Sequence, residues 1–130
     1  MKLLEISAMA VFLTATTISA KAPIGRSEFV ENYDSSTEII IIGTIHRPLI
    51  HHEKGRQIIH LLVSTGDHDV EVHIGPRYFL NWHHFQFEPG ETVEIVASKV
   101  KGEDHYLART VSVGGRVLVL RDKQGVAVWQ

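Results

Sequence analysis

Residues 78–87, with the sequence YFLNWHHFQF, interrupt a chain whose other segments have the pattern of β-strands. Tyr78, Trp82 and Phe85 recur here at positions i, i+4 and i+7, which is the spacing of one face of an α-helix. Pro76, just before the stretch, suits the first turn of a helix. The sequence therefore predicts a short amphipathic helix whose aromatic face packs into the core.

Strand signals lie on both sides of this predicted helix. Before it come EIIIIGTIH (38–46), RQIIHLLV (56–63) and HDVEVHI (68–74), and after it come EPGETVEIVAS (88–98), DHYLARTVSV (104–113) and RVLVLRDKQGVAVW (116–129). STGD and DKQG are turn signals, and the last segment is expected to be a hairpin around DKQG. A helix between the third and fourth strands is the layout of an OB-fold. We expect a mainly-β fold, a small OB-fold-like β-barrel with one short helix between strands 3 and 4 and an extra C-terminal hairpin.

The chain resembles the exported bacterial OB-fold (BOF-type) proteins, a largely uncharacterised family. The matching features, spread over about residues 38–113, are IIGTI in the first strand, TGDHDVEVHI across the second hairpin, Trp82, and EPGETVEIVAS before the fourth strand. A longer helical segment and the hairpin at residues 116–129 depart from the family pattern. The resemblance implies an OB-fold, export from the cytoplasm and binding in general terms, without catalytic residues to carry over.

The N-terminal segment has the layout of a secretory signal peptide. Lys2 precedes a mostly apolar run that ends in small residues at Ser19 and Ala20. We therefore expect a signal peptide at residues 1–20, a leader or linker at 21–37 and the OB-fold-like domain at 38–130. The alternative is an amphipathic first helix. A processed protein of this kind would be soluble, periplasmic and without a membrane anchor.

Composition limits the classes of function. The 130-residue chain has no cysteine, which removes disulfides and thiolate metal sites, and its formal charge is −2. A mildly acidic protein lacks the basic surface that nucleic-acid binding requires, so we expect no nucleic-acid partner. The sequence also lacks the G-x-S-x-G, glycine-rich phosphate-loop and H-E-x-x-H patterns, so we expect no enzyme and no catalytic residues.

Nine histidines raise the question of a metal site. None lies two, three or four residues from another, so local chelating motifs are absent. A non-local cluster follows if Thr65 and Gly66 form a two-residue turn. His60 then lies opposite Glu71 and diagonal to His73, on the face away from the core. Two imidazoles and a carboxylate would suit Zn, Cu or Ni. The simpler interpretation is a solvated face in which Glu71 pairs with a protonated histidine, and a one-residue change of register would destroy the cluster.

The same hairpin face, together with the segment HRPLIHHEKGR (46–56), is the expected ligand surface. We expect residues 46–56 to form a long polar loop of the kind that OB-folds use for binding. The candidate ligand-binding residues are His51, His52, Ile58, Leu62 and Asp69. His51 and His52 could contact a ligand or bring another donor to His60.

The expected function is that of an exported, non-catalytic binding or accessory module for a protein, peptide or small molecule, with no cofactor. The first alternative is a histidine-based binder or carrier of a divalent metal ion. The second alternative is an oligonucleotide-binding OB-fold. The sequence leaves the ligand, the oligomeric state and the role of the terminal hairpin open.

Overall fold

The computed structural model describes residues 33–100 and 105–129, which fall within one compact unit, Asn32–Gln130. The predicted signal peptide at 1–20 and most of the predicted leader at 21–37 lie outside the described residues. Within the described part of the chain, no helix is long and apolar enough to cross a membrane.

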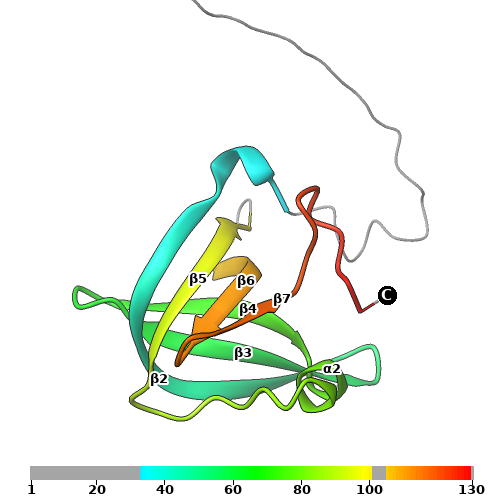
Figure 1. Ribbon diagram of the computed structural model, residues 1–130, viewed down its shortest axis with the longest axis horizontal. Helices are drawn as coiled ribbons and strands as arrows, with labels where there is room; N and C mark the ends of the chain where they lie inside the picture. The colour runs from blue at the N-terminus through cyan, green and yellow to red at the C-terminus, as the bar shows by residue number, and fades with distance from the viewer. Residues whose placement is uncertain (1–32, 101–104, 130) are drawn as a thin grey trace, which may run out of the picture. The chain divides into compact units, whose positions relative to one another are not determined.

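Six strands and two short helical segments make up the described fold (Figure 1). In chain order they are η3 (Ser35–Thr37), β2 (Ile39–Glu53), β3 (Arg56–Ser64), β4 (Asp69–Pro76), α2 (Arg77–Trp82), β5 (Thr92–Lys99), β6 (His105–Val113) and β7 (Arg116–Val119). The predicted mainly-β architecture, with one short helix between its third and fourth strands, is confirmed.

The strands form a partly closed ring. Their order in the sheet is β4-β3-β2-β5-β6-β7, and β4 also pairs with β6. The β4–β6 pairing is parallel and the other five pairings are antiparallel. The parallel contact closes the ring of β2 to β6 in an OB-fold-like order, and β7 extends the sheet beyond it.

Strand β2 is long because it serves two partners. Its first part, Ile39–Thr44, pairs with β5, and its second part, Thr44–Glu53, pairs with β3. The prediction of a polar loop at residues 46–56 is therefore wrong. Those residues continue β2, turn at Lys54 and Gly55, and begin β3. Both turn residues have positive φ, 50° and 79°, as a tight type I′ hairpin requires.

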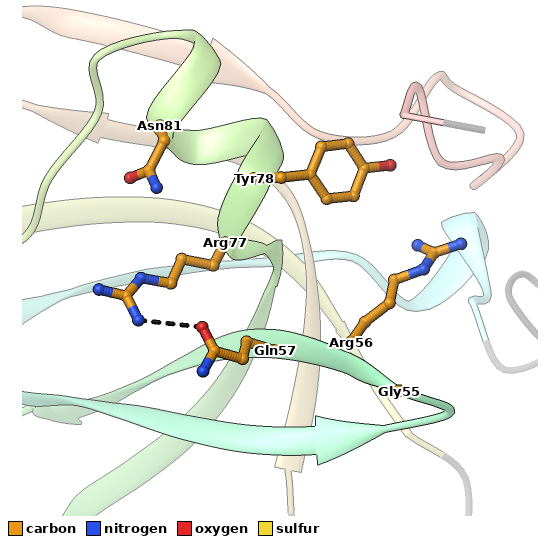
Figure 2. A pocket seen from close by; sticks show the side chains of 6 residues that line it. All are labelled: Gly55, Arg56, Gln57, Arg77, Tyr78 and Asn81. Carbon is orange, nitrogen blue, oxygen red and sulfur yellow. Dashed lines mark hydrogen bonds between the residues drawn. The ribbon is translucent and has the colours of Figure 1, made fainter.

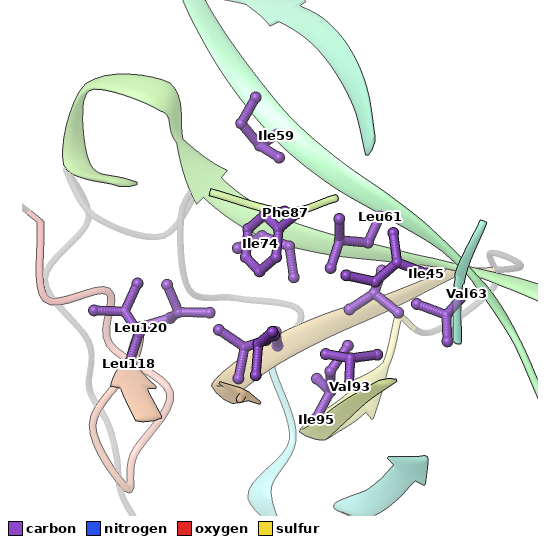
Figure 3. Close-up of a cluster of buried hydrophobic side chains, with 14 of the residues drawn as sticks. Ile45, Ile59, Leu61, Val63, Ile74, Phe87, Val93, Ile95, Leu118 and Leu120 are labelled. Carbon is purple, nitrogen blue, oxygen red and sulfur yellow. The ribbon is translucent and has the colours of Figure 1, made fainter. Parts of the chain in front are cut away.

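The core lies inside the ring and is built by alternating side chains (Figure 3). Isoleucine, leucine and valine dominate it. Its fully buried members include Ile45, Leu61, Val63, Val72, Ile74, Val93, Ile95, Val111 and Leu120. A smaller cluster of Tyr33, Val100 and Leu107 lies apart from it.

Helix α2 does not bury the aromatic face that the sequence predicts. Tyr78 and Trp82 are 54% and 79% exposed, whereas Leu80 is buried. The helix has only six residues and ends at Trp82. Phe85 lies beyond its end, so it does not share a helical face with Tyr78 and Trp82. Phe85 reaches the core from the following turn, where its backbone N–H donates to the carbonyl of Leu80.

The C-terminal hairpin around DKQG forms as a tight turn. One bridge, Arg121 to Ala127, closes it. The Asp122 carboxylate accepts hydrogen bonds from the backbone N–H groups of Gln124 and Val126. The chain then returns toward α2, because the Tyr78 hydroxyl donates to the carbonyl of Trp129.

A half-buried ion pair joins the beginning of β2 to β6. Arg109 donates through Nε and Nη2 to the carboxylate of Glu38, and the Tyr33 hydroxyl donates to the same carboxylate at 2.5 Å. The hydrogen bond from Arg109 is the main cause that holds the pKa of Glu38 below its ordinary value. Folding therefore favours the charged form of Glu38.

Replacing Gly43 by alanine should destabilise the protein by about 1–3 kcal/mol, the usual range for overpacking. A Cβ atom at this position would lie 2.3 Å from the carbonyl oxygen of Ser64 and 2.8 Å from a methyl group of Val63. Urea unfolding monitored by circular dichroism measures the change. Thr44→Ala, at the next, exposed position of β2, is the control, and equal stability of the two variants would contradict the close approach.

Replacing Glu38 by glutamine should lower the free energy of unfolding by about 1–2 kcal/mol at pH 7. Because the pKa of Glu38 is lowered in the folded state, its stabilisation is present above the ordinary value of 4.5 and is lost as the pH falls below it. Unfolding curves between pH 7 and pH 3 should therefore converge for wild type and variant. Glu94→Gln, at an exposed position on β5, should show no such pattern, and a constant difference for Glu38→Gln would contradict the assignment.

Candidate functional site

The pairing of β3 with β4 places His60 and His73 on the face of these strands that is directed away from the core. His60 pairs with His73, whereas Leu61 pairs with Val72 on the core side. His60 is nevertheless only 5% exposed. Other polar side chains must therefore cover this imidazole.

The register of the β3–β4 hairpin differs from the predicted one by two residues. Ser64 pairs with Asp69, so residues 65–68 form the connection in place of a two-residue turn. The backbone N–H of Thr65 donates to the carbonyl of His68 within it. A shift of two residues preserves the face of every side chain, whereas a shift of one reverses it. His60 therefore lies opposite His73, and Glu71 lies one step along β4 on the same face.

A β-bulge in β2 brings further polar side chains to this face. The register changes between Ile45, which pairs with Val63 of the core, and Arg47, which pairs with outward-directed Leu62. The extra residue reverses the alternation, so that odd-numbered residues face the core before the bulge and face outward after it. His51 and Glu53 consequently lie on the same side of the sheet as His60.

We call His51, Glu53, His60, Glu71 and His73 the His60 cluster. The Nδ1 atom of His60 lies 2.8 Å from Oε2 of Glu71, and its Nε2 atom lies 3.7 Å from Oε2 of Glu53. The Nε2 atom of His51 lies 3.1 Å from the same oxygen of Glu71. The ring centroids of His51 and His73 are 4.1 Å and 5.0 Å from that of His60. Four side chains from β2 and β4 thus meet around the imidazole of His60 on β3.

Two combinations of these residues have the spacing of metal ligands. Within the described residues, His51, His60 and Glu71 form one set and Glu53, His60 and His73 form another, with the ligand atoms of each set within 4.8 Å of one another. The sequence predicted His60, Glu71 and His73 as one site. The structure gathers all three but divides them between two sets that share His60.

Burial keeps the central imidazoles neutral. Desolvation lowers the pKa of His60, helped by the nearby His51, although its hydrogen bond to Glu71 acts in the opposite direction. Desolvation lowers the pKa of His73 to about 3, followed in importance by the nearby His60 and Arg121. Neutral imidazole is the form that binds metal ions. Moreover, Nε2 of His60 and Nδ1 of His73 are buried without a hydrogen-bond partner.

The candidate ligand-binding residues lie in different surroundings. His51 belongs to the His60 cluster, exposed His52 alternates to the other side of β2, and Ile58 is buried. Leu62 is half-buried. Asp69 is exposed and pairs with His46 at 3.2 Å.

Two members of this region were missed by sequence reasoning. Glu53 was placed in a loop, although Lys54-Gly55 between IHHE and RQII is a possible hairpin signal. His105, whose ring centroid lies 6.0 Å from that of His60, comes from β6 through its parallel pairing with Glu71. No local sequence pattern indicates a contact between residues so far apart in the chain.

A second feature is an open pocket of about 440 Å³ beside α2 (Figure 2). It is lined by Gly55, Arg56, Gln57, Arg77, Tyr78 and Asn81. Arg77 donates a 2.9 Å hydrogen bond to the side-chain oxygen of Gln57. The side chains of Arg56 and Arg77 extend in opposite directions in Figure 2, so their charged groups do not converge on one ligand. The His60 cluster is therefore the stronger candidate site.

Replacing His73 by leucine should raise the free energy of unfolding of the metal-free protein by about 1 kcal/mol at pH 7. The variant removes a buried nitrogen without a hydrogen-bond partner, and such a group costs about 1–3 kcal/mol. Urea unfolding in the presence of a chelator measures the change. His52→Leu, at an exposed position, should stay within about 0.5 kcal/mol of wild type. A loss of stability in His73→Leu would mean that its neighbours satisfy the imidazole.

Comparison with known proteins gives a family for the chain. Residues 40–118 match the model of the MamS/MamX magnetosome protein family, and this range is more than half of the 130 residues. No curated protein and no solved structure matches. Assignment to the exported bacterial OB-fold proteins is therefore wrong. It depended on the order of strands, turns and helix, and unrelated families can share such a layout because they share a fold.

Proposed function

Because the chain belongs to the MamS/MamX magnetosome protein family, we propose that it is a magnetosome-associated, non-catalytic protein that binds a divalent transition-metal ion at the His60 cluster. One observation carries the metal proposal. His60 stands at the intersection of two three-residue ligand sets, and its Nε2 atom is buried without a hydrogen-bond partner.

The simplest interpretation of the cluster is a group of solvated side chains that bind no ion. Exposed histidines and carboxylates need no ion, and surface pairs of this kind contribute little to stability. His60 differs because it is buried, neutral and surrounded by two carboxylates and two further imidazoles. Leaving its nitrogen unsatisfied costs free energy that an ion would recover. This cost supports a ligand at the site.

The donor set indicates the class of ion. Imidazole nitrogen combined with carboxylate oxygen suits Zn²⁺, Cu²⁺, Ni²⁺ and Fe²⁺, whereas Ca²⁺ and Mg²⁺ prefer oxygen ligands alone. Three protein ligands leave coordination positions for water or for another molecule. A site of this kind suits reversible binding and transfer better than permanent structural binding, for which four protein ligands are usual.

The cellular location of the protein and its non-catalytic role are part of the proposal. The signal-peptide pattern of residues 1–20 supports export, with the periplasmic side of a membrane as the compartment. The absence of established catalytic motifs from the sequence supports an accessory role. Binding of a protein or peptide partner, and the lack of a nucleic-acid partner, stay predictions.

Thermal and chemical unfolding of the purified, metal-stripped protein tests the proposal. We expect at least one of Zn²⁺, Cu²⁺, Ni²⁺ and Fe²⁺, the last under anaerobic conditions, to stabilise the protein. The gain should be about 2.7 kcal/mol when the free ion exceeds Kd by 100-fold. Mg²⁺ at the same concentration should have no effect.

His60→Ala and His52→Ala form a matched pair for this experiment. Both remove one histidine, but only His60 belongs to both ligand sets. The metal-dependent gain should disappear in His60→Ala and persist in His52→Ala. The same gain in both variants, or no gain with any ion in wild type, would overturn metal binding at the His60 cluster.

A further inference from the structure

We infer that the ion is held by Glu53, His60 and His73, while Glu71 is a positioning residue that fixes the proton of His60 on Nδ1. This inference rests on the proposed function and deepens it, because it selects one of the two overlapping ligand sets. It also revises the predicted ligand set of His60, Glu71 and His73 by replacing Glu71 with Glu53.

The hydrogen bond between His60 and Glu71 decides the tautomer. The Nδ1 atom of His60 lies 2.8 Å from Oε2 of Glu71. An ionised carboxylate can only accept hydrogen bonds, so Nδ1 must carry the proton that is donated. A neutral imidazole has a single N–H, and the buried Nε2 of His60 has no hydrogen-bond partner that could accept a second one. The lone pair available to an ion is therefore on Nε2.

The free nitrogen is directed toward the set that contains His73. Nε2 of His60 lies 3.7 Å from Oε2 of Glu53, which is too far for a hydrogen bond. It is compatible with two ligands of one ion, since ligand atoms each about 2.1 Å from a metal lie roughly 3–4 Å apart. The ligand atoms of Glu53, His60 and His73 lie within 4.8 Å of one another, and His73 also has a buried nitrogen without a partner.

The alternative set is already occupied by its own contacts. Oε2 of Glu71 lies 2.8 Å from Nδ1 of His60 and 3.1 Å from Nε2 of His51. An ion between these atoms would have to displace the proton shared by His60 and Glu71. The set of Glu53, His60 and His73 requires no such displacement. A carboxylate that orients a metal-binding histidine through its other nitrogen is a common arrangement, and its loss typically weakens metal binding about 10–100-fold.

The same reasoning sets the stoichiometry. Both ligand sets use His60, and a neutral imidazole offers one lone pair to one ion. The chain should therefore bind one ion at this cluster. His51, whose ring lies 4.1 Å from that of His60, acts as a cover and is not a ligand.

The tautomer can be measured without any metal. Long-range ¹H–¹⁵N NMR correlations of the metal-free wild-type protein distinguish Nδ1–H from Nε2–H imidazole. We expect His60 to be the Nδ1–H tautomer, with its signals assigned by comparison with His60→Gln. Finding the Nε2–H tautomer, or a doubly protonated ring at pH 7, would overturn the inference even if metal ions bind.

Two substitutions of Glu71 separate positioning from direct coordination. Glutamine keeps an oxygen that can accept the Nδ1–H hydrogen bond but loses the charge of a ligand, whereas leucine loses both. Calorimetric titration with Zn²⁺ should give a Kd for Glu71→Gln within about threefold of wild type and a Kd for Glu71→Leu weaker by about 10–100-fold. Equal, large losses in both variants would identify Glu71 as a ligand and overturn the inference.

Substitutions of the other members complete the test. Glu53→Gln and His73→Gln should each weaken Zn²⁺ binding more than Glu71→Gln does, by about tenfold or more, and His51→Gln should leave it nearly unchanged. The reverse order, or two ions bound per chain, would favour the set with His51 and overturn the inference. Absence of Zn²⁺, Cu²⁺, Ni²⁺ and Fe²⁺ binding in wild type, with the Nδ1–H tautomer present, would instead overturn the proposed function.

Discussion

The arrangement of the site depends on the β-bulge of β2 between Ile45 and Arg47. Strand β2 pairs with β5 along its first part and with β3 along its second part. Without the extra residue, regular alternation would direct His51 and Glu53 to the same side as Ile45, which is fully buried in the core. The bulge therefore lets a single strand contribute apolar side chains to the interior and His51 and Glu53 to the His60 cluster on the exterior.

Sequence reasoning succeeded where the signal was local and periodic. The inward-facing residues of β3 and β4 and the place of the helix in the strand order follow from alternation and from turn residues. The hairpin register was wrong by two residues, yet the grouping of His60, Glu71 and His73 survived because the side chains of a strand repeat every two residues. The predicted aromatic helix face is wrong because α2 directs Leu80 into the core and leaves Tyr78 and Trp82 exposed, while Phe85 lies beyond its end.

The remaining members of the site could not be read from the sequence for a physical reason. Glu53 reaches His60 only because of the bulge, and a bulge is a local change of hydrogen bonding without a reliable sequence pattern. His105 reaches the same region through the parallel pairing of β4 with β6, which joins segments more than thirty residues apart. Neutral, partly unsatisfied histidines in this position also reduce stability. Burial of the apolar core cluster on the opposite side of the sheet supplies stability that offsets this cost.

The parallel pairing of β4 with β6 also links the closure of the ring to the His60 cluster. It consists of three residue pairs, and Glu71 and His73 belong to two of them. The pairing that closes the ring is thus built from the same segment of β4 that contributes Glu71 and His73 to the His60 cluster. An ion held by Glu53, His60 and His73 would tie β2, β3 and β4 together beside this pairing. Binding of the ion would then hold β4 against its neighbours, and so stabilise the strand that closes the ring against β6.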